Sequence, residues 1–127
     1  MFGKKDRGGK KDGGRLGRNR ITILTKDNSR YASLDASTRV VERGDLLIFA
    51  SRHEGDDPPE MLEIQFPRGN VCNEENSEIK MVNLPVNSFV QVWVCRSAPF
   101  GRLGFSITGY KMRDGHAADI VVGDEGD

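Results

Sequence analysis

Short segments in which apolar and polar residues alternate are the feature of this sequence that most restricts its fold. The clearest is Met61–Phe66, where the apolar residues Leu62, Ile64 and Phe66 are separated by polar ones. A period of two puts the two sets of side chains on opposite faces of a strand. The segment therefore predicts a half-buried strand in an antiparallel sheet.

Other segments also have strand character. Phe89–Cys95 and Leu46–Ala50 are apolar on both faces, which predicts central strands that are covered on both sides. Leu103–Ile107 alternates, and Ser29–Glu42 favours a pair of strands with at most one helical turn. Weaker candidates are Arg20–Leu24, Glu78–Val82 and Asp119–Val122.

Gly, Pro, Asn and Asp residues separate these segments, as is typical of turns between short strands. We therefore expect an all-β fold, an antiparallel, jelly-roll-like β-sandwich of about seven to nine strands. The chain has 127 residues, the size of one domain. We assign the sandwich to residues 21–122, a flexible basic arm to residues 1–20 and an acidic tail to residues 123–127.

The charge of the sequence is unevenly distributed although it sums to zero, with 19 basic and 19 acidic side chains. Residues 1–20 hold eight basic and two acidic side chains, a net charge of +6, and the remainder of the chain has −6. Six of the 15 glycines also lie in residues 1–20, which contain few large apolar groups. Such a segment cannot offset the roughly 1–2 kcal/mol per residue that ordering a backbone costs, so we expect a flexible arm.

A flexible basic arm predicts binding to nucleic acid, because Lys and Arg side chains neutralise phosphates and release their counterions. The glycine spacing is similar to that of arginine–glycine segments that bind RNA. Docking on acidic patches of neighbouring subunits, or a merely solubilising tail, are the alternatives. The candidate nucleic-acid-binding residues are Lys4, Lys5, Arg7, Lys10, Lys11, Arg15, Arg18 and Arg20.

A basic arm ahead of a compact β-sandwich resembles, in architecture alone, the small capsid or virion subunits that neutralise packaged genomes. This resemblance implies a non-enzymatic structural or assembly protein that self-associates into a homo-oligomer or a larger assembly. The alternative is a monomeric β-sandwich module that binds calcium, carbohydrate or a protein ligand. In that module the loops His53–Pro59 and Asn70–Asn76 would hold the ligand at one end of the fold.

The sequence contains no apolar run long enough to span a membrane, and no apolar segment follows its charged start. We therefore expect neither a membrane span nor a secretory signal, and a location in the cytoplasm or in a virion. In the cytoplasm Cys72 and Cys95 would be reduced, although a pairing between them stays open.

Patterns for catalysis and for metal binding are weak. The His53–Asp57 segment combines one imidazole with three carboxylates, but its spacing fits no complete calcium loop, so we expect a solvated loop without metal. The serines and both histidines lack a recognised catalytic context, so we expect no enzyme and no cofactor.

The aromatic residues of the predicted strand Phe89–Cys95 do not indicate base recognition. A base-stacking face needs exposed aromatics interleaved with Lys or Arg, and this strand has no basic residue within it. We therefore expect Phe89 and Trp93 to be core residues or subunit contacts, and assign nucleic-acid binding to the arm alone.

Overall fold

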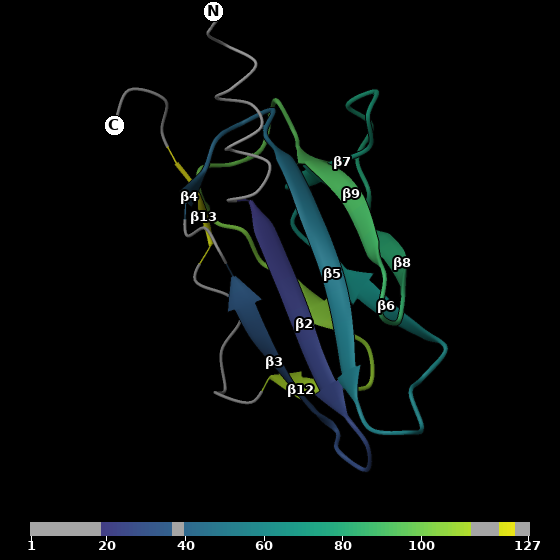
Figure 1. Ribbon diagram of the computed structural model, residues 1–127. Coiled ribbons are helices and arrows are strands. Elements are labelled where there is room, and N and C mark those ends of the chain that lie inside the picture. Colours follow the sequence, from purple (N-terminus) through teal and green to yellow (C-terminus); the bar gives the residue numbers. More distant parts are fainter. Residues whose placement is uncertain (1–18, 37–39, 113–119, 124–127) are drawn as a thin grey trace, which may run out of the picture.

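The structure, a computed structural model, describes residues 19–36, 40–112 and 120–123 (Figure 1). Every regular element in these ranges is a β-strand, which confirms the all-β fold class. The strands are β2 (Arg20–Lys26), β3 (Tyr31–Ala36), β4 (Val40–Val41), β5 (Leu46–Glu54), β6 (Met61–Gln65), β7 (Val71–Cys72), β8 (Met81–Pro85), β9 (Phe89–Val94), β10 (Gly101–Arg102), β11 (Ser106–Ile107), β12 (Lys111–Met112) and β13 (Val121–Val122).

The described strands form three sheets. The largest has the order β12-β3-β2-β5-β9-β7, and β3, β2, β5 and β9 run side by side in Figure 1. The two smaller sheets have the orders β11-β6-β8 and β10-β13-β4. The segment Ser29–Glu42 forms two strands, as expected, but β3 joins the large sheet while β4 pairs with β13.

The expected purely antiparallel arrangement is wrong for three strand pairs. β2 lies parallel to β5 over seven residue pairs, β12 lies parallel to β3, and β13 lies parallel to β4. Parallel strands need a long connection rather than a tight hairpin. Each of these pairs joins strands that are distant in the chain, which local sequence patterns do not reveal.

One cluster of buried side chains joins the large sheet to the β11-β6-β8 sheet. Phe49 of β5 packs edge-on against Phe66 and Phe105, with ring centroids 5.5 Å and 5.2 Å apart. Such edge-to-face pairs are favourable beyond the area that they bury. Phe66 directly follows β6 and Phe105 directly precedes β11, so the three rings fix the two sheets to each other.

The alternating segments fold as their patterns predict. Leu62, Ile64 and Phe66 are fully or almost fully buried, and β6 occupies most of the predicted strand. Leu103–Ile107 shows the expected alternation of buried and exposed residues, but only Ser106–Ile107 pairs with another strand.

The prediction that Phe89–Cys95 is covered on both faces is wrong at its start. β9 lies between β5 and β7, but Phe89 is 58% exposed. β7 pairs only with Val94 and Trp93, so it flanks only the end of β9. The Phe89 side chain lies on the side of the sheet that faces away from the core, and it is open there.

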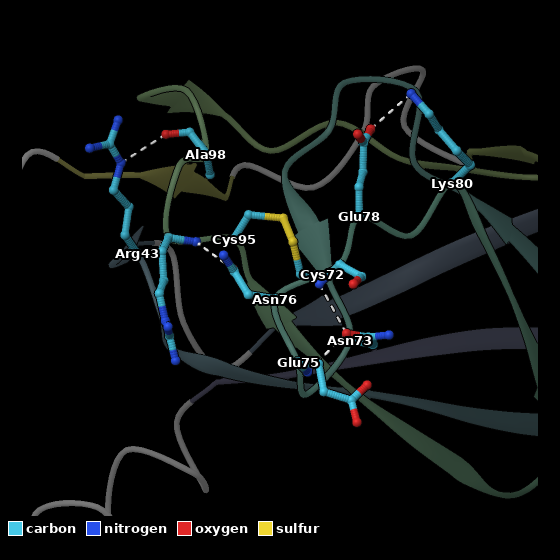
Figure 2. Close-up of a disulfide and its surroundings, with 11 residues drawn as sticks. Arg43, Cys72, Asn73, Glu75, Asn76, Glu78, Lys80, Cys95 and Ala98 are labelled. Carbon is cyan, nitrogen blue, oxygen red and sulfur yellow. Dashed lines mark hydrogen bonds and ion pairs between the residues drawn. A yellow bond between two sulfur atoms is a disulfide. The ribbon is translucent and has the colours of Figure 1, made fainter.

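Cys72 and Cys95 form a buried disulfide, so the expectation of reduced thiols is wrong (Figure 2). β7 lies antiparallel to β9, with Cys72 opposite Trp93, two residues before Cys95. The Cys95 amide donates a hydrogen bond to the Asn70 carbonyl and continues the pairing beyond the strands. This register brings the two Cα atoms to 5.1 Å, within the range for a disulfide.

Candidate functional site

Of the predicted nucleic-acid-binding residues, the structure describes only Arg20. The other seven, Lys4, Lys5, Arg7, Lys10, Lys11, Arg15 and Arg18, lie outside the described residues. Arg20 is exposed and begins β2, where it pairs in register with Ile48 of β5. Its neighbour Ile21 is fully buried, so Arg20 points to the opposite side, away from the core.

We use the term outer face for the side of the six-stranded sheet that points away from the core. Its residues on β12, β3, β2, β5 and β9 follow from the strand registers. They are Arg20, Thr22, Leu24, Lys26, Tyr31, Ser33, Asp35, Leu46, Ile48, Ala50, Arg52, Glu54, Phe89, Gln91, Trp93 and Lys111.

The outer face combines exposed aromatic side chains with basic ones. Phe89 is 58% and Tyr31 47% exposed, whereas Trp93 is half-buried. The basic residues come from different strands, with Arg20 and Lys26 on β2, Arg52 on β5 and Lys111 on β12. β9 itself contains no basic residue, and the basic residues of the outer face come from the neighbouring strands.

A hollow of about 560 Å³ lies on the outer face, over β2, β3 and β5. Its volume is within the range of about 300–1,000 Å³ typical of small-molecule sites. Apolar, hydroxyl and charged side chains all line this hollow. Its lining includes Leu24, Lys26, Tyr31, Ser33, Arg52 and Glu54.

At the end of β5, His53 connects the turn after β2 to the loop after β5. Its Nε2 lies 2.7 Å from Asp27 Oδ1, and its Nδ1 lies 2.9 Å from the Thr25 hydroxyl. A carboxylate only accepts hydrogen bonds, so Nε2 donates to Asp27, and in the neutral ring Nδ1 accepts from Thr25. We call this row of three side chains the His53 junction.

The Asp27 carboxylate in the His53 junction also accepts hydrogen bonds from the amides of Asp56 and Asp57, at 2.9 Å and 3.1 Å. The hydrogen bond from His53 lowers the pKa of Asp27, and these two amides act in the same direction against the opposing effect of burial. The ionised carboxylate thus anchors the predicted solvated loop. Within the described ranges, no three His, Cys, Asp or Glu side chains gather in a way that could hold a metal ion.

The two loops that the binding-module alternative places together lie at opposite ends of the large sheet. His53–Pro59 spans the end of β5 and the loop after it, whereas Asn70–Asn76 surrounds β7. β7 pairs with Trp93, which pairs with Leu46 at the start of β5. In Figure 1, β7 lies near the top of the sheet and the loop after β5 near the bottom. The prediction of one shared ligand site is therefore wrong.

At the end of the large sheet that carries the disulfide, asparagine side chains hold the neighbouring turn in place (Figure 2). Asn73 Oδ1 accepts hydrogen bonds from the amides of Glu75 and Ser77, so it closes the turn after Cys72. Asn76 Oδ1 accepts one from the amide of Arg96, which joins this turn to the chain beyond Cys95. The side-chain oxygens of Asn73 and Asn76 therefore serve to hold these segments together.

Comparisons with protein-family models, with curated proteins and with solved structures found no match for this chain. The described residues contain no helix that is long and apolar enough to cross a membrane.

Proposed function

We propose that this chain is a non-enzymatic structural protein, of the kind that forms capsid or virion subunits, and that its basic side chains bind nucleic-acid phosphates. One observation carries the proposal: Arg20, the last basic residue of the segment 1–20, lies on the same face as the basic residues of three strands. Apart from Arg20, the outer face has three basic and two acidic residues, which adds a net charge of +1 to the +6 of that segment. Each phosphate contact releases counterions and so contributes affinity without regard to sequence.

The His53 junction supports a role in contact rather than in chemistry. A hydroxyl, an imidazole and a carboxylate stand in a row, as in hydrolases that use a nucleophile activated by a base. However, Thr25 is only 4% exposed and the His53 side chain 2%, so both are largely covered where they border the hollow on the outer face. Both ring nitrogens are engaged in holding the two loops.

We also propose that the large sheet and the β11-β6-β8 sheet are the layers of a jelly-roll-like β-sandwich that self-associates. The shared core around Phe49 supports the sandwich. Exposed Met61 and Met81 at the ends of the smaller sheet's strands support contacts with other copies. Of the two expected locations, the disulfide favours the virion, because the cytoplasm keeps thiols reduced.

A salt titration tests the nucleic-acid proposal. The affinity of the full chain and of a chain that starts at Arg20 is measured by fluorescence anisotropy with a labelled oligonucleotide. With about six phosphates neutralised on a single strand, log K should fall with log salt at a slope of roughly −4, and the shortened chain should have a clearly smaller slope. Equal curves that do not respond to salt would exclude the proposal.

Native mass measured on the same samples tests the assembly. We expect a defined mass of several subunits. A monomer whose melting temperature rises with calcium would instead support the binding module, since a ligand that binds only the native state stabilises it.

A further inference from the structure

We infer that the outer face binds the bases of a single-stranded nucleic acid, with Tyr31 and Phe89 as stacking platforms and the hollow beside Tyr31 as a base subsite. The inference rests on the proposed function and specifies its ligand: phosphate contacts accept any nucleic acid, whereas these aromatics need unpaired bases. An aromatic side chain can stack on an unpaired base, but in a duplex the neighbouring base pairs cover the face of each base.

The chemistry of the hollow fits a nucleotide. Tyr31 and Leu24 offer aromatic and apolar surface for the face of a base, and Ser33 offers a hydroxyl for its edge. Arg52 and Lys26 line the same hollow and bring positive charge for a phosphate. The arrangement thus supplies groups for the base and for the phosphate of a nucleotide within one hollow of about 560 Å³.

The register of the strands makes Phe89 a second platform on the same surface. Phe89 lies opposite Ala50, which lies opposite Thr22, and Tyr31 lies two strands from Ala50 on β3. Strand spacings of about 4.8 Å and rises of about 3.3 Å per residue put the two aromatics roughly 20 Å apart. Leu24 and Arg52, which lie opposite each other in register, stand on the outer face between the two aromatics, so one strand of several nucleotides can contact both.

The charge around the platforms favours this ligand over an apolar protein surface. Arg20, Lys26, Arg52 and Lys111 surround the aromatic residues, and only Asp35 and Glu54 oppose them on the outer face. An apolar partner would have to desolvate these charged groups, which costs free energy. A phosphate backbone neutralises them.

The experiment uses the full chain and two probes of equal length and charge, an oligothymidine and an abasic strand that keeps the phosphates but lacks bases. The variants are Tyr31→Ala and Phe89→Ala, each at an exposed position outside the buried core. Phe100→Ala is the matched control, because Phe100 is 47% exposed like Tyr31 but adjoins β10 in a different sheet.

Each platform variant should weaken oligothymidine binding about fivefold or more and leave abasic-strand binding unchanged, because base stacking is lost and phosphate contacts remain. Phe100→Ala should change neither affinity. Arg52→Ala should weaken both probes, and Arg96→Ala, at the disulfide end, should weaken them less.

Two results would overturn the inference: unchanged oligothymidine binding by both platform variants, or equal losses on both probes. Either result leaves the proposed function intact if the wild-type chain still binds both probes in a salt-dependent way. Failure of the wild-type chain to bind either probe would instead reject the proposed function, and the inference with it.

Discussion

At the residue scale, the His53 side chain is a polar group held by several hydrogen bonds. It is almost completely buried and hydrogen-bonded through both ring nitrogens, while its backbone amide donates to Asn87 Oδ1. Gly55 completes the arrangement, because a Cβ there would lie 2.3 Å from the carboxyl carbon of Asp27. Its φ of +128° is also one that L residues with a side chain rarely adopt. The conformation of the loop after β5 thus depends on His53, Asp27 and Gly55.

Thr25→Val tests the hydrogen bond to His53 Nδ1. Valine keeps the shape of threonine but leaves a buried ring nitrogen without its partner, so we expect a loss of about 1–3 kcal/mol in the free energy of unfolding. Urea denaturation at pH 7 measures it. Thr22→Val is the control, because Thr22 lies on the outer face of the same strand. Equal effects of the two substitutions would contradict the role of Thr25.

Asp27→Asn tests the pH dependence of the His53 junction. Because the pKa of Asp27 in the folded chain lies below its ordinary value of 3.8, the ionised carboxylate stabilises the fold fully above that value. This stabilisation is lost as the pH falls through the lowered pKa. The difference in unfolding free energy between wild type and variant should therefore shrink below about pH 4.

The same substitution in a His53→Gln background should show a weaker pH dependence, because the largest cause of the lowered pKa is absent. Urea denaturation between pH 7 and pH 2.5 measures the unfolding free energy of wild type and Asp27→Asn, and of His53→Gln with and without Asp27→Asn. A difference between wild type and Asp27→Asn that stays constant with pH would contradict this account.

At the scale of elements, the disulfide adds a covalent link to β7, which is too short to pair extensively with β9. This strand has two residues, and its pairing with β9 covers only Val94 and Trp93. The disulfide closes a loop over a sequence separation of 23 that contains β8 and β9, and thereby ties β7 to the end of β9. A cross-link of this kind stabilises chiefly by restricting the unfolded chain.

Replacing both cysteines by alanine should lower the free energy of unfolding by about 3 kcal/mol, given the length of the closed loop. Urea denaturation measures this loss, and wild type in the presence of a reductant should approach the double variant. Two free thiols in the native, untreated protein, found by thiol titration, would contradict the pairing.

The sequence allowed the strands to be located far better than their partners. The apolar positions of Met61–Phe66 follow from a period of two, which is a local property. The parallel pairing of β2 with β5 and the disulfide depend on contacts between distant segments. Local sequence patterns therefore predict neither the pairing nor the disulfide.

The sequence did not predict the outer face as a candidate site, because this face too depends on contacts between distant segments. β9 alone offers aromatics without cations, and only the register of four strands brings Arg52 and Tyr31 to the surface that also holds Phe89. Arg52 lies beyond the predicted strand Leu46–Ala50, because the pattern changes from apolar to charged there while the strand continues to Glu54.

At the scale of the whole molecule, two positively charged parts adjoin. Residues 1–20 carry a net charge of +6, and their last residue is already part of β2. We propose that a strand of nucleic acid held by the first part is thereby brought to the outer face, where its unpaired bases contact aromatic side chains. The remainder of the chain is acidic overall, which disfavours binding of a polyanion elsewhere.

Photochemical cross-linking tests this central claim most directly. The full chain is irradiated with a single strand that contains a photoreactive thymidine analogue, and the cross-linked peptides are identified by mass spectrometry. We predict cross-links in residues 1–20 and at Tyr31 and Phe89 on the outer face. Cross-links confined to the exposed side of β6 and β8, or no cross-links under conditions where the strand is bound, would contradict the account.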